Sequence, residues 1–250
     1  MLSKAKAKYI QSLSHKKVRD ELQLFIAEGP KVVQEFLSSG DTSCIMLLVT
    51  QSFLETRTPR MFDSVTELIV VEPFELNKVS QLVTPHDVLG VFSQKKMTAP
   101  VLSDDLSLLL DGIRDPGNLG TIIRIADWFA IKNLVCSEDT VDCFNSKVVQ
   151  ASMGSLLRLN IWYGNLENYI LANSNIPVYA ATLEGENVFT MGRISEGLLV
   201  IGNESAGISK NILDLAKTKI AIPRIGKAES LNAAVACGIL LSSLTKTQLS

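Results

Sequence analysis

A buried strand, a polar turn and a helix follow one another between residues 106 and 129, and this stretch constrains the fold most strongly. Residues 106–110 are four leucines and a serine, a pattern typical of a strand covered on both faces. The turn at residues 111–120 holds three glycines, a proline and an asparagine. The helix that follows places Ile122, Ile123, Ala126 and Phe129 on one side. The pattern predicts a strand–turn–helix unit of an α/β sheet.

Arg124 lies inside this otherwise apolar helix, about two turns after Asn118. We expect its side chain to lie inward of the turn, away from bulk solvent. An arginine on the buried side of a helix is costly unless an anion or a polar partner meets it. The sequence therefore indicates a polar or anionic ligand near Arg124.

Further apolar strands are predicted at residues 134–136, 177–181 and 198–201, alternating with helical stretches. About five such strands predict a parallel sheet with helices on both faces. The ligand of such a sheet normally lies beyond the carboxyl ends of its strands. Three Gly-rich turns follow strands, at residues 111–120, 202–209 and 223–230, so we expect the functional site there.

The first 95 residues predict a smaller, separate α/β domain. Its expected strands lie at residues 24–27, 44–49, 68–71 and 88–92, and its expected helices at 3–13, 31–38 and 73–81. Residues 96–104 contain polar residues and a proline, which is typical of a linker. We therefore expect a domain at residues 1–95, a linker at 96–104 and a second domain at 105–250.

Composition favours a globular, cytoplasmic protein without a metal site. The chain is 46% hydrophobic and 20% charged, no apolar run reaches the ~18 residues of a membrane span, and no apolar signal core follows the N-terminus. Two histidines and the absence of a CxxC pair leave no zinc pattern. We expect reduced thiols at Cys44, Cys136, Cys143 and Cys237.

Six basic residues and no acidic one lie between residues 1 and 19, although the net charge of the chain is −2. A solvated basic helix would explain them, and so would a surface that contacts nucleic-acid phosphates. Lys16, Lys17 and Arg19 are the candidates for such contacts.

Taken singly, the second and third turns have ordinary structural explanations. Gly202 and Gly207 permit a positive φ or the close approach of a ligand, and Ser209 is placed to cap a helix. Glu204 stands at a strand end as a candidate polar orienter. For Asn232 the residues alone favour a capping or solvent role over a functional one. Neither a GxGxxG fingerprint nor a P-loop occurs.

Together, the three turns resemble in order and spacing the three motifs of the SpoU/TrmH family, RNA 2′-O-ribose methyltransferases of the SPOUT class. Residues 118–124 (NLGTIIR) resemble the first motif, 202–209 (GNESAGIS) the second and 222–232 (IPRIGKAESLN) the third. The resemblance covers residues 105–245 approximately. Residues 16–29 and 85–92 resemble the RNA-substrate-binding domain found at the N-terminus of many members.

The resemblance implies a parallel sheet whose end is threaded into a deep trefoil knot, a rare feature that periodicity cannot show. It implies a homodimer and transfer of a methyl group from S-adenosylmethionine to a ribose 2′-hydroxyl of RNA, preferably ribosomal RNA. No metal is needed because the sulfonium is already an activated donor. A bulky side chain at Gly202 is expected to abolish cofactor binding while the fold survives. The residues carried over as cofactor-binding are Thr182, Leu183, Gly202, Asn203, Ile222, Ile225 and Leu231.

The residues carried over as catalytic are Arg124, Asn118, Glu204, Ser230 and Asn232. A guanidinium with a pKa above ~12 is a poor base. We expect Arg124 to grip a phosphate and to stabilise the developing alkoxide. The other four are expected to orient the hydroxyl and Arg124. Lys16, Lys17, Arg19 and Arg114 are the expected RNA contacts.

Three alternatives stay open. The first is a tRNA 2′-O-methyltransferase, and the second is a non-catalytic RNA-binding protein on the same fold. The third is a nucleotide-dependent α/β enzyme that uses residues 202–207 as its phosphate loop. The lack of a Lys or Asp beside that loop argues against the third.

Overall fold

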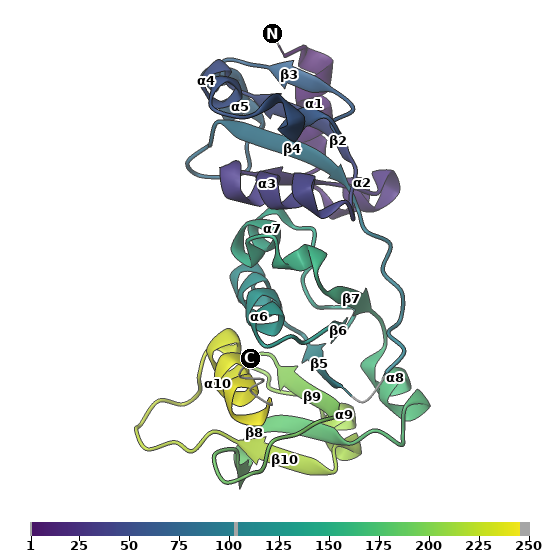
Figure 1. Ribbon diagram of the computed structural model, residues 1–250. Coiled ribbons are helices and arrows are strands. Elements are labelled where there is room, and N and C mark those ends of the chain that lie inside the picture. Colours follow the sequence, from purple (N-terminus) through teal and green to yellow (C-terminus); the bar gives the residue numbers. More distant parts are fainter. Residues whose placement is uncertain (1, 103–104, 246–250) are drawn as a thin grey trace. The chain divides into compact units, whose positions relative to one another are not determined.

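The computed structural model describes residues 2–102 and 105–245 and contains two compact units (Figure 1). The first comprises Met1–Lys96 and Asp142–Leu157, and the second comprises Met97–Val141 and Arg158–Ser250. The first unit therefore includes a segment that follows the predicted linker by about forty residues in the chain. Ser103 and Asp104 of that linker lie outside the described residues, as do Met1 and residues 246–250.

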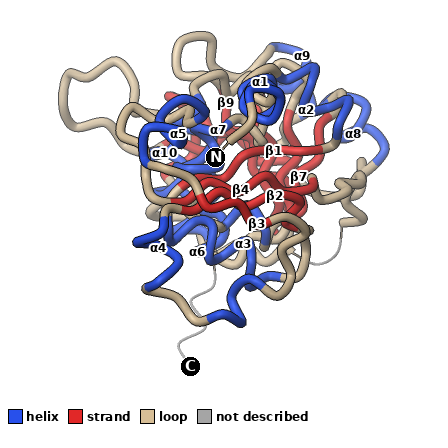
Figure 2. Tube along the Cα trace, turned by 90° about the horizontal axis from the view of Figure 1, so that it is seen from above, coloured by secondary structure: helices blue, strands red, loops and turns tan. Residues whose placement is uncertain are grey.

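A four-stranded sheet forms the centre of the first unit. Its order is β1-β4-β2-β3 (Figure 2). The strand β4 runs antiparallel to both neighbours, and β3 runs parallel to β2. All four strands were expected from the sequence, whereas α2, α4 and the short η1 were not. The elements are α1 (Lys4–Ser12), α2 (Lys16–Leu22), β1 (Leu24–Glu28), α3 (Pro30–Ser39), β2 (Cys44–Val49), α4 (Gln51–Glu55), η1 (Pro59–Phe62), β3 (Leu68–Val70), α5 (Pro73–Val79) and β4 (Val88–Ser93).

Both faces of this sheet are covered, which explains why every residue of β1 is buried. Leu24 and Ile26 point into a core shared with residues of α1 and α5. Phe25 points to the other face, where its ring centroid lies 5.2 Å from that of Phe36 in α3 and 4.9 Å from that of Phe144. Phe144 belongs to the segment 142–157, whose helix α7 (Ser146–Ser152) packs against β1.

Six parallel strands form the sheet of the second unit, in the order β10-β8-β9-β5-β6-β7. This confirms the predicted α/β architecture with a parallel sheet. The elements are β5 (Leu106–Asp111), α6 (Pro116–Trp128), β6 (Asn133–Cys136), β7 (Asn160–Tyr163), α8 (Leu166–Ala172), β8 (Val178–Asn187), β9 (Gly197–Gly202), α9 (Lys210–Leu215), β10 (Thr218–Ala221) and α10 (Ala233–Leu244).

Helices cover this sheet on both faces and leave the carboxyl edge to the turns. On one face, Leu109, Leu198 and Val200 share a core with residues of α8 and α9. The alternate residues Leu108 and Leu199 are equally buried. The helix α10 contacts β9 and packs against α6, its neighbour in Figure 1. Among the described residues, no helix has the length and apolar character that a membrane span requires.

Candidate functional site

The first two Gly-rich turns lie side by side because their strands pair. In the register of β5 and β9, Asp111 lies opposite Gly202. The carboxylate of Asp111 accepts a hydrogen bond from the main chain of Ser209 at 2.7 Å. The third turn follows β10, which belongs to the same parallel sheet. All three turns therefore emerge from one edge of the sheet, as the sequence predicted.

Asn203 organises the second turn through its side chain. Its amide donates to the carbonyl of Gly112 at 2.9 Å, and its side-chain oxygen accepts from the main chain of Ser205 at 2.9 Å and of Ala206 at 3.0 Å. Main-chain hydrogen bonds between Asn203 and Gly207, at 2.9 and 3.0 Å, close the loop. The turn is thus a self-supporting structure that is tied to the first turn.

Gly202 is required by the turn itself. A Cβ placed on Gly202 would lie 2.4 Å from the carbonyl carbon of Gly207 and 2.5 Å from the nitrogen of Ile208. Backbone atoms cannot yield to such a contact as the end of a flexible side chain can. A bulky residue at this position must shift the turn as well as enter the cavity, so another residue is a cleaner probe of cofactor binding.

A hydrogen-bonded chain of three side chains joins the three motifs. The side-chain nitrogen of Asn232 donates to the side-chain oxygen of Asn118 at 2.8 Å, and the nitrogen of Asn118 donates to the carboxylate of Glu204. A carboxylate only accepts, so the Asn118 amide can have only this orientation. Asn232 also caps α10, accepting from the main chain of Ala234 and Val235. Asn232 therefore both caps α10 and takes part in the hydrogen-bonded chain of the site.

A cavity of 640 Å³ opens beside this chain, between the second and third turns. Glu204 and Ser230 lie in its walls, which are otherwise largely apolar. The helix α10 contributes Ala236 and Leu240, which the sequence did not single out. Contacts of the expected cofactor residues with a ligand remain a prediction. All seven of them line the cavity: Thr182, Leu183, Gly202, Asn203, Ile222, Ile225 and Leu231.

Arg124 does not lie inward as expected. The buried side of α6 carries Leu119, Ile122, Ile123 and Ala126. At ~100° per residue, Arg124 points away from that side, and it is exposed to solvent. It forms no hydrogen bond or ion pair with the residues that the structure describes. In a single chain, therefore, Arg124 stands outside the hydrogen-bonded chain that joins the other motif residues.

The RNA-contact candidates differ in their accessibility. The side chain of Arg114 is 73% exposed and lies 3.1 Å from Asp139. A hydrogen bond from Ser137, together with the guanidinium of Arg114, lowers the pKa of the Asp139 carboxyl. Lys16 and Lys17 are exposed on α2, and Lys16 pairs with Asp20 at 2.6 Å. All three side chains are exposed to solvent, so a phosphate can reach them.

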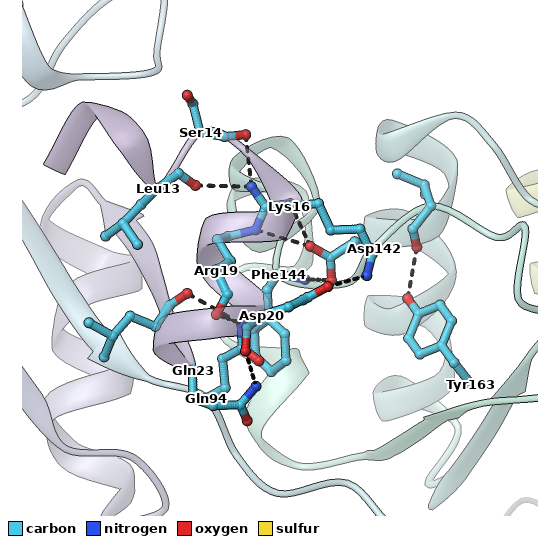
Figure 3. Close-up of polar contacts among 12 residues, drawn as sticks. Leu13, Ser14, Lys16, Arg19, Asp20, Gln23, Gln94, Asp142, Phe144 and Tyr163 are labelled. Carbon is cyan, nitrogen blue, oxygen red and sulfur yellow. Dashed lines mark hydrogen bonds and ion pairs between the residues drawn. The ribbon is translucent and has the colours of Figure 1, made fainter. Parts of the chain in front are cut away.

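Arg19 is inaccessible to a phosphate, so the expectation that it contacts RNA is wrong. Its side chain is 4% exposed and forms an ion pair with Asp142, with Nη2 2.6 Å and Nε 3.0 Å from one carboxylate oxygen (Figure 3). Its remaining nitrogen donates to the carbonyls of Leu13 at 3.0 Å and Ser14 at 2.8 Å. Every nitrogen of the guanidinium is hydrogen-bonded within the protein and the side chain is buried, so it is not available to RNA.

The four cysteines are buried and form no disulfide with one another, as the sequence predicted. Burial raises the pKa of the Cys44 and Cys237 thiols to about 12 and raises that of Cys136 as well. A thiol of such high pKa is a weak nucleophile at neutral pH. Within the described ranges, no three His, Cys, Asp or Glu side chains gather where they could hold a metal ion.

Comparison with known families matches residues 105–242 to the SpoU rRNA Methylase family. The match covers more than half of the chain and all three motifs. The chain belongs to this family. Residues 4–90 match the MRM3-like substrate binding domain.

Individual SpoU relatives extend over nearly the whole chain. The 23S rRNA (guanosine(2553)-2′-O)-methyltransferase RlmP of Bacillus subtilis is 31% identical over 96% of this chain and 95% of its own length. An AdoMet-bound rRNA methyltransferase from Sinorhizobium meliloti superposes with a TM-score of 0.87 at 31% identity, covering 100% of this chain and 97% of its own. The AdoMet complex of AviRb from Streptomyces viridochromogenes gives 0.85 at 26% identity, covering 96% and 97%.

Proposed function

We propose that this SpoU protein transfers a methyl group from S-adenosylmethionine to a ribose 2′-hydroxyl of RNA, and that the RNA is ribosomal. The observation that carries the proposal is the hydrogen-bonded chain from Asn232 through Asn118 to Glu204 at the wall of the 640 Å³ cavity. The names of the relatives, which specify 2′-O-methylation of 23S rRNA and bound AdoMet, support the reaction and the substrate.

The cavity fits the cofactor in size and chemistry. Small-molecule sites occupy about 300–1,000 Å³ and are mostly apolar, with a few polar groups that fix orientation. Apolar walls such as those at Leu183, Ile222 and Leu231 suit an adenine ring. Glu204 and Glu229 place two carboxylates in the walls against the single cation of Arg224, a balance that suits a positively charged ligand.

When bound, the cofactor supplies a methyl group on a positively charged sulfur. The protein must then hold the ribose hydroxyl in line and stabilise its oxygen as the proton passes to water. Asn232 fixes Asn118 from one side and Glu204 fixes it from the other, so the amide is pre-organised before substrate arrives. Ser230 lies exposed in the same wall and can meet the hydroxyl directly.

The proposal includes a homodimer whose site is completed across the interface. Trp128 of α6 is 84% exposed and Val235 of α10 is 51% exposed, on two helices that pack together. Exposed large apolar side chains in one region indicate an interaction surface. Arg124 lies one turn before Trp128, so a partner that covers the tryptophan would also meet the arginine. The deep trefoil knot and the cytoplasmic location belong to the same proposal and rest on family membership.

The direct test is methyl transfer from labelled S-adenosylmethionine to deproteinised ribosomal RNA and, in parallel, to tRNA. Mapping ribose methylation in RNA from cells with and without the protein would then identify the nucleotide. Transfer to tRNA alone would favour the tRNA alternative. Cofactor binding without transfer to either RNA would favour a non-catalytic RNA-binding protein.

Filling the cavity should abolish cofactor binding. Ala236 lies half-buried on the wall that α10 forms, so Ala236→Phe places a ring in the cavity without a change in the turns. We expect the affinity for S-adenosylmethionine, measured by isothermal titration, to fall at least about tenfold. Ala172→Phe, at the exposed end of α8, is the matched control. An unchanged affinity in Ala236→Phe would place the cofactor elsewhere.

The direction of the hydrogen bond between Asn118 and Glu204 can be reversed by exchanging the two side-chain types. Asn118→Asp removes the donor to Glu204 and sets two carboxylates against each other, so single-turnover methyl transfer should fall about a hundredfold. In the double variant Asn118→Asp, Glu204→Gln, the new amide donates to the new carboxylate, which still accepts from Asn232. Transfer should recover in part. No recovery would mean that Glu204 has a role beyond orienting Asn118.

A further inference from the structure

A second cavity, of 490 Å³, lies in the first compact unit between α3, the chain that follows α4, and η1. In contrast to the cofactor cavity, its walls are mainly polar. They carry two guanidinium groups and four hydroxyl side chains, with Leu37 and Met61 as the apolar side chains. The lining residues are Gln34, Leu37, Ser38, Thr56, Arg57, Thr58, Arg60, Met61, Asp63 and Ser64.

Arg57 is held in place yet lacks a full set of acceptors. Its guanidinium carbon lies 4.9 Å from the centroid of the Phe53 ring, an arrangement that fixes the group by cation–π attraction. Its Nε is buried and has no hydrogen-bond partner within the described part of the chain. Its one side-chain hydrogen bond runs to the carbonyl of Thr56 at 3.5 Å. The guanidinium therefore keeps donors for which the described residues supply no acceptor, and a ligand in the cavity that Arg57 lines can supply one.

Arg60 provides a second cation in the walls of the same cavity. It is exposed and forms no ion pair with any residue that the structure describes. Asp63 is the one carboxylate among the lining residues, and it forms no ion pair with either arginine. The cavity walls therefore carry an excess of one positive charge, on two planar groups whose geometry matches phosphate oxygens.

We propose that this cavity is a subsite for a phosphodiester of the RNA backbone. The choice of RNA rests on the proposed function. Inorganic phosphate shares the chemistry, but the cavity also offers hydroxyl groups that suit a ribose and is large enough for a sugar–phosphate unit. This subsite lies outside the basic stretch at residues 1–19 that the sequence indicated for phosphate contacts.

The test compares binding of deproteinised ribosomal RNA across a range of salt concentrations for the full chain and its variants. Arg57→Met with Arg60→Met removes both charges and keeps the aliphatic stems. Arg60→Glu alone guards against a folding defect, because Arg60 is exposed and unpaired. Lys78→Met, at an exposed position of α5, is the control for loss of one charge elsewhere in the same unit. Inorganic phosphate is titrated separately by phosphorus NMR.

Both arginine variants should bind ribosomal RNA about tenfold more weakly, and the salt slope should fall by ~0.7 for each phosphate that the variant no longer binds. Lys78→Met should bind like the parent. Unchanged binding in the arginine variants, or an equal weakening in Lys78→Met, overturns the subsite. Phosphate binding as strong as RNA binding would overturn its assignment to the RNA backbone.

Methyl transfer by the parent protein is measured in the same preparations. A parent that binds ribosomal RNA through both arginines but transfers no methyl group would overturn the proposed function and leave the subsite standing. If the parent transfers methyl groups but its RNA binding does not depend on either arginine, the subsite is overturned and the proposed function stands.

Discussion

Replacing Asp142 by alanine should lower the free energy of unfolding of the first compact unit by about 3–5 kcal/mol. The substitution leaves the guanidinium of Arg19 buried, with two of its nitrogens deprived of their acceptor. Removing one member of a buried ion pair is costly because the remaining charge cannot return to water. The measurement is urea-induced unfolding, combined with amide hydrogen exchange in β1, against which the segment 142–157 packs.

A control distinguishes the loss of the Arg19–Asp142 ion pair from the loss of side-chain packing around it. In Arg19→Met, Asp142→Leu both charges are replaced by apolar side chains, and stability should return close to that of the parent. Lys16→Ala removes an exposed ion pair on α2 and should cost less than ~1 kcal/mol. A loss below ~1 kcal/mol in Asp142→Ala would show that Arg19 finds water or another acceptor.

Local patterns in the sequence were enough to predict much of the fold. Apolar runs bounded by Gly and Pro predicted the strands β1, β2, β4, β5 and β9 to within about one or two residues, since strand burial and turn chemistry are encoded locally. The rule that ligands bind at the carboxyl edge of a parallel sheet then brought three distant turns together. The resemblance to the SpoU/TrmH family added the residues that line the cavity.

Long-range pairing could not be predicted in the same way. Arg19 and Asp142 are 123 residues apart, and nothing in the neighbourhood of either residue indicates the other. Without knowledge of Asp142, the local sequence does not distinguish Arg19 from the exposed Lys16 and Lys17. The roles of Asp111 and Asp115, by contrast, could have been predicted from the local sequence. An aspartate at the end of a strand is a typical tether, and an aspartate before a proline at the start of a helix is a typical cap.

The exposure of Arg124 also depends on contacts between distant parts of the chain. Its helix is apolar on more than one side, so the sequence alone did not show which side faces the core. Trp128, one turn later, is exposed as well. The exposed tryptophan and the unpaired arginine on this helix are the observations that support the proposed dimer interface.

Arg124→Ala should therefore remove most turnover while leaving cofactor binding and stability close to those of the parent. The residue is exposed and unpaired among the described residues, so its removal creates no cavity or orphaned partner. Deleting an interaction made only in the transition state should slow single-turnover methyl transfer by about two to three orders of magnitude. Arg124→Lys should recover little, because a point charge cannot replace a planar fork. If Arg124→Lys transfers the methyl group at a rate near that of the parent, a positive charge alone is sufficient for the role of this residue.

Mixing variants would show which cavity Arg124 serves. Arg124→Ala has an intact cavity, and Ala236→Phe has an intact arginine. If Arg124 acts on the cavity of its dimer partner, a mixed dimer contains one subunit with a filled cavity that receives no arginine, and one with an open cavity that receives the arginine of its partner. Random mixing of a symmetric dimer should then restore roughly a quarter of parental activity.

If Arg124 instead serves the cavity of its own chain, neither subunit of the mixed dimer has both parts, and activity should stay at the level of the separate variants. Two copies of Arg124→Ala mixed with each other are the control for the exchange procedure. Parental activity in Arg124→Ala by itself would remove the residue from the catalytic assignment, and the hydrogen-bonded chain of Asn232, Asn118 and Glu204 would then have to account for the stabilisation of the ribose oxygen.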